Sequence, residues 1–240
     1  MGYLPIFIDV SGRDCVVIGG GEIAERKTRS LIEAGAIVVI VSPEVTAGLA
    51  AMGGAGAIRH LARAYRHGDL AGAFLAFEAT GDGATAAAAA AEARERRVLI
   101  NVADVPELCS FIAPAVVQRG GLQLAICTSG ASPALARKIR AELEERFGPE
   151  YELTIDVLAA ARQWLRSHQP DRGTRARLLG VLVNSDLHEC LKRGDFAATE
   201  AIAKRVLGAS LAEIGFEPPR VAAAVSRQPA APNGRTNESR

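Results

Sequence analysis

Residues 15–24 read CVVIGGGEIA, a short apolar run followed by three glycines and the start of a mixed polar and apolar segment. The apolar run predicts a buried strand over 15–18, and the glycines predict a tight turn. Residues 22–34 predict a helix, because Gly35 follows where helices commonly end on glycine. The β-branched run at 37–41 is typical of a strand covered on both faces. Together these segments predict one complete βαβ unit.

The residues that follow repeat the alternation of strand and helix. Residues 74–79 and 98–102 predict strands, and the Ala-rich residues 84–97 between them predict a helix that Asp82 caps. Alternating strands and helices are typical of the α/β class, in which helices cover both faces of a parallel sheet. The sequence therefore predicts a doubly wound, Rossmann-type parallel sheet.

The pattern changes after residue 113. Residues 122–127 alternate as a strand does, and Ser132-Pro133 is a typical N-cap and first residue for the helix that follows. From residue 151 onward the sequence predicts helices and no strand, with helical segments around 151–167, 174–184 and 195–207. We expect a Rossmann-like domain over 1–113, a small α+β segment over 114–150, a helical domain over 151–225 and a disordered tail over 226–240.

Composition and charge exclude several classes of protein. Hydrophobic residues make up 49% of the chain and charged residues 23%, as in a folded globular protein rather than a disordered one. The formal net charge of +1 provides no overall field to attract nucleic acid or an anionic membrane, so we expect neither partner. No long apolar run predicts a membrane span and no secretion signal opens the sequence, which favours a cytoplasmic protein.

The cysteines and histidines show no metal-ligand spacing. The cysteines are far apart without a CxxC pair, and the histidines do not cluster with them. We therefore predict reduced thiols and no protein-bound metal. The residues concerned are Cys15, Cys109, Cys127, Cys190, His60, His67, His168 and His188.

Gly19 to Ala24 match the dinucleotide-binding pattern G-x-G-x-x-A. In that pattern Gly19 permits a tight turn, Gly21 lets a pyrophosphate approach the backbone, and the small Ala24 lets the helix pack closely on the strand. Glu22 and Ile23 would open the helix, whose free N–H groups and dipole favour phosphate. The alternative is a strand-to-helix turn that binds no ligand.

The residues after the second and later strands bear on the choice of cofactor. NAD sites commonly hold the ribose with an acidic residue about 20 residues after the glycines, and Glu44 is the nearby candidate. It lies beyond Ser42-Pro43 rather than on the strand, so Ser42 or backbone groups are alternative ribose ligands. No arginine stands there to bind a 2′-phosphate, which favours NAD over NADP. Thr80, after the strand at 74–79, is expected near the nicotinamide, with a plain turn as the alternative.

Several segments in order carry a resemblance to a known family. Residues 4–7 (LPIF) precede the glycine turn and 24–27 (AERK) follow it, and later come 101–104 (NVAD), 110–114 (SFIAP), 128–133 (TSGASP) and 135–137 (LAR). Over about residues 3–150 they resemble the precorrin-2 dehydrogenase/sirohydrochlorin ferrochelatase family, the N-terminal part of sirohaem synthase. The methyltransferase domain of many bacterial members does not follow, so we expect a stand-alone form.

The resemblance implies a reaction and its base. It implies oxidation of precorrin-2 to sirohydrochlorin with NAD as hydride acceptor, and in bifunctional members insertion of ferrous iron, with cobaltous ion as another candidate metal substrate. Asp104 matches the family's catalytic aspartate and is expected to act as general base. It follows the predicted strand 98–102, at the edge where open α/β sheets bind ligands. The alternative for Asp104 is an Asx turn before Val105-Pro106.

The same resemblance implies residues that contact the tetrapyrrole. Thr128, Ser129 and Gly130 match the family's substrate loop, in which Thr128 takes the place of a phosphorylatable or substrate-contacting hydroxyl. Arg137, on the helix that follows, could pair with the carboxylates of a tetrapyrrole. The alternatives are ordinary turn chemistry for Thr128 and a solvated helix face for Arg137.

Residues 128–147 resemble the family's dimerisation region, which predicts a homodimer whose sites combine residues of both chains. Three other functions are open from the sequence. Another NAD-dependent oxidoreductase would keep the glycine turn and leave the loop at 128–130 incidental. A non-catalytic NAD(H)-sensing module would bind dinucleotide without needing Asp104, and a pure chelatase would insert metal without NAD.

Overall fold

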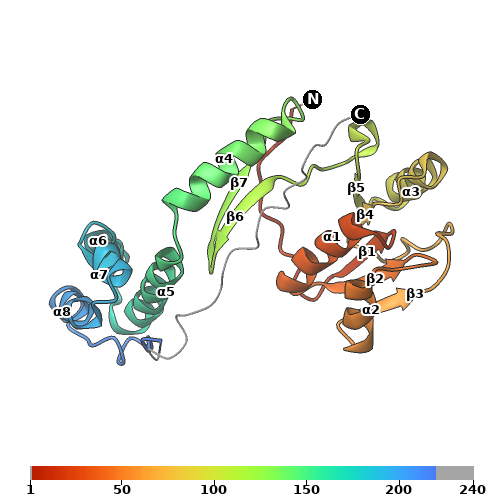
Figure 1. Ribbon diagram of the computed structural model, residues 1–240. Coiled ribbons are helices and arrows are strands. Elements are labelled where there is room, and N and C mark those ends of the chain that lie inside the picture. Colours follow the sequence, from red (N-terminus) through yellow and green to blue (C-terminus); the bar gives the residue numbers. More distant parts are fainter. Residues whose placement is uncertain (1, 220–240) are drawn as a thin grey trace. The chain divides into compact units, whose positions relative to one another are not determined.

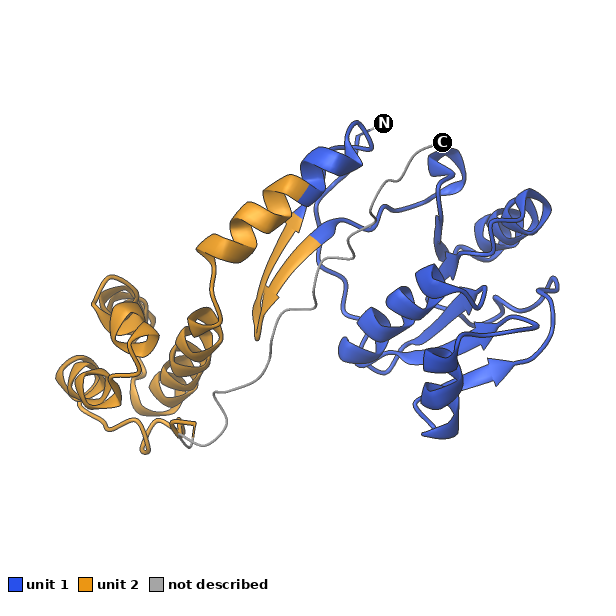
Figure 2. Ribbon diagram, in the orientation of Figure 1, with its two compact units in different colours: residues 1–115, 126–137 blue, residues 116–125, 138–240 orange. Residues whose placement is uncertain are grey.

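The computed structural model describes residues 2–219, and contacts divide the chain into two compact units (Figure 1, Figure 2). The first unit contains the chain up to Ala115 together with Ile126–Arg137, and the second contains Val116–Ala125 and the chain from Lys138 onward. The domain boundaries predicted at residues 113, 150 and 225 stay predictions. The predicted tail at 226–240 lies outside the described residues.

A five-stranded parallel sheet forms the core of the first unit, which confirms the predicted α/β class. Its strands are β1 (Asp14–Ile18), β2 (Ile37–Val41), β3 (Ile58–Leu61), β4 (Leu75–Glu78) and β5 (Leu99–Val102). In space their order is β3-β2-β1-β4-β5, so the chain first moves outward from β1 and then returns to its other side. Ligands of open α/β sheets bind beyond the carboxyl ends of the strands at such a reversal. A ligand site is therefore expected at the carboxyl ends of β1 and β4.

Helices cover both faces of this sheet. The helices α1 (Glu22–Glu33) and α2 (Ala47–Gly54) contribute to the apolar cluster on one face, and α3 (Gly83–Arg96) contributes to the cluster on the other. Successive residues of a strand point to opposite faces. Accordingly Val17 packs in the cluster of α1 while Val16 packs in the cluster of α3. Burial on both faces explains why β1 is apolar without interruption.

The sequence did not predict the helix α2 or the strand β3 of the first unit. The helix α2 consists mainly of alanine and glycine and has no polar stripe to mark it, and its start depends on Thr46, whose hydroxyl accepts a hydrogen bond from the Leu49 N–H (3.2 Å). The strand β3 is only four residues long and lies at the edge of the sheet. Both elements are stabilised by contacts that local periodicity does not reveal.

The strand β5 is the other edge of the sheet, and the segment after it covers its free side. The short 3₁₀ helix η1 (Pro106–Leu108) turns the chain back. Ser110 then accepts a hydrogen bond from the Ile100 N–H through its hydroxyl (2.8 Å) and donates its own N–H to the Ile100 carbonyl (2.8 Å). The Cys109 thiol donates to the Val102 carbonyl (3.3 Å). These contacts occupy backbone groups that would otherwise be open to a foreign strand.

A two-stranded sheet and a helix follow. The strands β6 (Ala115–Arg119) and β7 (Leu122–Ile126) pair across a two-residue connection, and α4 (Pro133–Arg146) comes next. The sequence predicted β7 and α4 but not β6. Ser132 caps α4, because its hydroxyl accepts from the Leu135 N–H (3.2 Å), which confirms the predicted N-cap.

The remainder of the described chain is helical, as predicted. Its helices are α5 (Glu150–His168), α6 (Arg172–Val183), α7 (Leu187–Lys192) and α8 (Phe196–Leu207), of which the short α7 was not predicted. Leu165, Leu182, Leu187 and Leu207 lie in one buried apolar cluster that joins the four helices. Within residues 2–219 no helix combines the length and apolar character that crossing a membrane requires.

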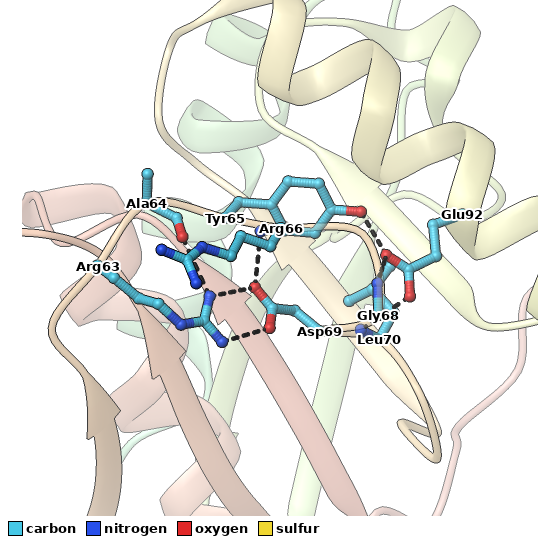
Figure 3. A network of polar contacts seen from close by, with 8 residues as sticks. All are labelled: Arg63, Ala64, Tyr65, Arg66, Gly68, Asp69, Leu70 and Glu92. Carbon is cyan, nitrogen blue, oxygen red and sulfur yellow. Dashed lines mark hydrogen bonds and ion pairs between the residues drawn. The ribbon is translucent and has the colours of Figure 1, made fainter.

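A polar network ties α3 to the crossover segment between β3 and β4 (Figure 3). Glu92 of α3 is fully buried and accepts hydrogen bonds from the Tyr65 hydroxyl (2.5 Å), the Gly68 N–H (2.9 Å), the Leu70 N–H (3.2 Å) and the Arg96 guanidinium (2.7 Å). Burial opposes the charge, but these hydrogen bonds outweigh it and hold the pKa of the Glu92 carboxyl below its ordinary value.

A second ion pair braces the same segment. Arg63 donates two hydrogen bonds to the Asp69 carboxylate (2.7 and 2.6 Å), and the Arg66 N–H donates to it as well (2.8 Å) (Figure 3). The Arg63 guanidinium is the largest cause that lowers the pKa of Asp69. The two networks together fold an otherwise irregular connection onto the sheet.

We expect the substitution Glu92→Gln to lower the free energy of unfolding by about 2–4 kcal/mol. The NH₂ group of the glutamine would face hydrogen-bond donors that now point at the buried carboxylate. The matched control is Glu95→Gln on the same helix, where an exposed carboxylate contacts exposed His67, and its effect should stay within about 0.5 kcal/mol. Urea unfolding at pH 7 measures both.

The effect should depend on pH in one direction. Since the pKa of Glu92 is lowered by folding, its contribution is present above the ordinary carboxyl pKa and is lost as the pH falls through the folded value. The difference between wild type and Glu92→Gln should therefore shrink in acid. A difference that is constant from pH 7 to the acid limit of folding would contradict this account.

Candidate active site

Gly19 sits at the carboxyl end of β1, where the order of the strands reverses. Its φ of +117° lies in the region that side chains rarely adopt, and an added Cβ would stand 2.7 Å from the Ala79 carbonyl oxygen. Its N–H donates to the Val41 carbonyl (2.9 Å). The glycine turn is therefore held between the neighbouring strands β2 and β4, as the tight turn predicted at Gly19 requires.

Gly20 also has no room for a side chain, and the sequence predicted no role for it. An added Cβ would stand 1.9 Å from the Glu44 carbonyl oxygen and 2.7 Å from the Ser42 hydroxyl oxygen. The Thr46 N–H in turn donates to the Gly20 carbonyl (2.9 Å). The loop after β2 thus lies directly against the glycine turn. Three successive glycines, where the motif needs only two, were the signal that could have revealed this contact.

Gly21 differs from both, because no atom of the described residues lies within 4 Å of the position its Cβ would take. It is the N-cap of α1, and within residues 2–219 no side chain caps that helix with a hydrogen bond. The N–H groups of Glu22 and Ile23 belong to this turn, and Ala24 is fully buried beneath it. An open backbone surface with free donors at a helix N-terminus fits the pyrophosphate of a dinucleotide.

Glu25 holds the surroundings of the glycine turn together. Its carboxylate accepts hydrogen bonds from the Thr46 hydroxyl (2.5 Å) and the Arg29 guanidinium (2.5 Å). The hydrogen bond from Thr46, followed by that from Arg29, lowers the pKa of Glu25. The side chain also fills the space beside Gly48 in α2. Glu25 thereby fastens α2 and the loop before it to α1.

The three residues proposed for the ribose form the turn after β2. The Ser42 hydroxyl donates to the Glu44 carbonyl (2.6 Å), and the Ser42 carbonyl contacts His60 Nε2 (2.9 Å). Ser42 is buried, whereas Pro43 and Glu44 are exposed. Among the described residues nothing bonds to the Glu44 carboxylate, which leaves it available beside the glycine turn. A ribose contact by any of these residues stays a prediction.

Glu78, the last residue of β4, is a buried carboxylate that the sequence analysis did not single out. It is 2% exposed, and its Oε1 accepts hydrogen bonds from both the N–H (2.8 Å) and the hydroxyl of Thr80. The Thr80 hydroxyl oxygen also accepts from the Asp82 N–H (3.1 Å), and Asp82 caps α3 as predicted. Thr80 is therefore fixed at the carboxyl edge beside the glycine turn. A charged final residue in an apolar strand was the available signal.

Asp104 lies in the turn directly after β5, at the same edge of the sheet. Its φ is +62°, a left-handed conformation that Asp and Asn tolerate better than most residues. The Ala103 N–H donates to the Glu78 carbonyl (2.9 Å), which ties this turn to β4. The side chain is exposed, and within the described part of the chain no hydrogen bond or ion pair engages its carboxylate. An Asx turn is therefore not what holds Asp104 in place.

The predicted substrate loop is a closed turn. The Thr128 hydroxyl donates to the Ser132 carbonyl (3.1 Å), and Ser129 and Gly130 both have left-handed backbone (φ +51° and +81°). Arg137 of α4 is exposed and has no ion-pair partner among residues 2–219, whereas its neighbours Lys138 and Arg140 pair with carboxylates one turn on. Substrate contacts by this loop and by Arg137 stay predictions.

The structure brings some of these residues together and leaves others apart. The glycine turn touches the Ser42–Glu44 turn directly, and its Gly19 lies against the end of β4 that carries Thr80. Asp104 follows the next strand of the same edge. Among the described residues no hydrogen bond joins the loop at 128–130 to any of them. The fold and this edge define a dinucleotide-binding protein of the Rossmann type.

Comparisons with known proteins agree with this class and narrow it. Residues 6–115 match a family model described as putative NAD(P)-binding, and residues 119–146 match one described as sirohaem biosynthesis protein central. These two matches, together with relatives named siroheme synthase, confirm the resemblance found in the sequence.

Named relatives support the same resemblance. The siroheme synthase of Azotobacter vinelandii is 38% identical over 212 residues, which is 88% of this chain and 45% of that protein. The siroheme synthase of Pseudomonas putida is 35% identical over 217 residues, 90% of this chain and 47% of that protein. The chain therefore spans about half the length of the curated relatives it matches.

A solved structure shares the fold. The structure described as SirC, precorrin-2 dehydrogenase, superimposes with a TM-score of 0.71 at 23% sequence identity, and the match covers 86% of this chain and all of that chain. At this level of identity the likeness concerns the fold alone. The shared fold is a Rossmann-like sheet followed by a small sheet and a helical part.

The contrast between two glycines gives a test of the dinucleotide site. We expect Gly21→Ala to leave the melting temperature unchanged, since its Cβ has open space, and to raise the Kd for NAD⁺ about tenfold or more, since the methyl group occupies the approach of the pyrophosphate. Gly20→Ala should instead lower the melting temperature, because its Cβ meets backbone. Thermal melts and NAD⁺ titrations distinguish them, and unchanged NAD⁺ binding by Gly21→Ala would contradict the assignment.

Proposed function

We propose that this chain catalyses the NAD-dependent oxidation of precorrin-2 to sirohydrochlorin. The observation that carries the proposal is the position of Asp104, whose carboxylate has no described partner and stands at the same sheet edge as the glycine turn. The match to the family model for sirohaem biosynthesis supports the choice of substrate, as do relatives named siroheme synthase and a fold neighbour named precorrin-2 dehydrogenase.

The reaction removes one hydride and one proton from the tetrapyrrole and adds a double bond to its conjugated system. Bound NAD⁺ supplies the acceptor for the hydride. Gly19, Gly20 and Gly21 shape the surface for its pyrophosphate, and the first-turn amides of α1 bind the phosphate charge. Asp104 accepts the proton, since its exposed carboxylate has no competing hydrogen bond or ion pair within the described chain.

The left-handed backbone at Asp104 favours this role over that of a passive turn residue. Such conformations cost free energy in residues other than glycine and cluster at functional sites. Glycine would fill this turn without strain, yet the chain places a carboxylate there. A module that only senses dinucleotide has no need of that group.

Anaerobic turnover of precorrin-2 with NAD⁺ tests the function. We expect NADH and sirohydrochlorin to appear in equal amounts with the wild-type chain. Asp104→Asn should lower turnover about a hundredfold or more, because the amide keeps the shape and tolerates the left-handed backbone but accepts no proton. Its Kd for NAD⁺ and its melting temperature should match those of wild type.

The matched control for this test is Glu107→Gln, which removes an exposed carboxylate three residues away in η1 and should leave turnover unchanged. Wild-type protein that binds NAD⁺ but yields no NADH from precorrin-2 would refute the proposal, and equal turnover by Asp104→Asn would refute the role of Asp104. Ferrous or cobaltous ion added to the sirohydrochlorin product then tests whether the chain also inserts a metal.

We also propose that the chain acts as a homodimer, joined through the sheet of β6 and β7. A sheet of two strands is marginal by itself, and each strand here has one edge without a partner in the described chain. Val116 on β6 is exposed, as a surface that pairs with a second copy requires.

We also propose a cytoplasmic location, because all four cysteines are free thiols, the state that a reducing compartment maintains.

Light scattering at micromolar concentration tests the dimer, for which we expect twice the mass of 25.1 kDa. Val116→Lys places a charge on the proposed interface and should shift the protein toward the monomer. Val181→Lys alters a similarly exposed valine on α6 and should leave the mass unchanged. A monomeric wild-type chain would contradict the proposal.

A further inference from the structure

Lys27 is a cation of the first unit that the proposed reaction does not use. It lies on the second turn of α1, is half-buried, and has its Nζ 4.9 Å from the centroid of the Phe77 ring. No carboxylate among residues 2–219 forms an ion pair or hydrogen bond with it. Burial, with a smaller contribution from Arg26, lowers the pKa of its ammonium group.

The position of Phe77 shows where this ammonium group lies. Phe77 is the residue before Glu78, close to the carboxyl end of β4. Side chains of a helix lean toward its N-terminus, so Lys27 reaches from α1 back toward the edge that carries the glycine turn. The cation is therefore near the carboxyl edge of the sheet, on the face that α1 covers.

The neighbours of Phe77 on that face are aromatic and polar. Phe77 pairs in register with Asn101 of β5, so both side chains point to the same face of the sheet. The ring of Phe111 meets the ring of Phe77 edge to face with centroids 5.5 Å apart, and the Asn101 amide donates to the Phe111 carbonyl (3.1 Å). Phe111 is itself only partly buried. Beside Lys27 there is thus a pair of aromatic rings, of which Phe77 is buried and Phe111 is partly open.

The absence of a described partner for Lys27 contrasts with three other cations of the first unit. Arg29 pairs with Glu25, Arg63 with Asp69, and Arg96 with buried Glu92. Removing a charge from water without an opposite charge is costly unless another group compensates. The Phe77 ring offers only a modest cation–π attraction in return. A ligand carboxylate would supply the missing opposite charge.

We propose that Lys27 is a substrate-binding residue whose ammonium group pairs with a carboxylate of the tetrapyrrole. The inference rests on the proposed function and extends it to a residue on α1. A flat conjugated ring system with peripheral carboxylates complements an aromatic surface flanked by a cation. The pyrophosphate of the dinucleotide is a weaker candidate, because the open first-turn amides at Gly21 already provide for it and Lys27 lies one turn further along the helix.

The test compares three variants by anaerobic titration with sirohydrochlorin and, separately, with NAD⁺. Lys27→Met keeps the length of the side chain over Phe77 and removes the charge, and it should raise the Kd for sirohydrochlorin about tenfold. Its Kd for NAD⁺ should be unchanged and its melting temperature no lower than that of wild type, because the lost charge has no ion-pair partner among residues 2–219. Arg26→Met removes the adjacent exposed cation of the same helix and should change neither Kd more than about twofold.

Lys27→Arg keeps the charge and guards against a loss of fold in Lys27→Met. Pairing predicts that arginine restores sirohydrochlorin binding to within about threefold of wild type. A role in packing alone predicts the reverse, with binding preserved by methionine and reduced by arginine. Sirohydrochlorin binding by Lys27→Met equal to that of wild type would overturn the inference, and so would a change confined to NAD⁺ affinity.

Failure of this inference is distinguishable from failure of the proposed function. Wild-type protein that oxidises precorrin-2 while Lys27→Met binds sirohydrochlorin normally refutes only the role of Lys27. Wild-type protein that neither oxidises precorrin-2 nor binds sirohydrochlorin refutes both. Separate measurement of kcat and KM adds a further check, since the loss of a binding residue in Lys27→Met should raise the KM for precorrin-2 more than it lowers kcat.

Discussion

The close approach of backbone to backbone at Gly19 and Gly20 is the constraint on which the site depends. One glycine lies against the Ala79 carbonyl and the other against the Glu44 carbonyl, so the turn after β1 is pressed between the ends of β4 and β2. Neither approach leaves room for a side chain. Because the turn is held on both sides, α1 begins in a defined place, at the carboxyl edge of the sheet where the strand order reverses.

Much of the fold follows from local sequence, and the exceptions have a common physical cause. Periodicity and terminal residues predict the strand at 15–18, the helix that ends before Gly35 and the capped helix after Asp82. By contrast, α2 depends on a Thr46 cap that Glu25 supports from another helix, and the crossover segment folds around buried Glu92. Such elements are stabilised by partners distant in sequence, which a local pattern does not display.

The candidate site divides in the same way. The tight turn at Gly19, the open space at Gly21 and the burial of Ala24 could be predicted from a motif, because each depends on the residue's own lack of a side chain or on its small size. The anchoring of Thr80 by Glu78 and the isolation of Lys27 could not, because each depends on which residues surround a charge. Ser42 shows the converse, since its hydroxyl, a candidate ribose ligand in the sequence, is bonded to the Glu44 carbonyl.

The left-handed backbone at Asp104 also limits how this position can change over time. Only residues that accept such a conformation fit the turn without strain, and these are chiefly glycine, asparagine and aspartate. Codons for asparagine and for glycine each lie one nucleotide from a codon for aspartate. A single point mutation could therefore abolish the proposed proton transfer while leaving a stable, folded dinucleotide-binding domain. Descendants of such a chain would be free to acquire a regulatory use for a bound dinucleotide without first having to solve the problem of folding.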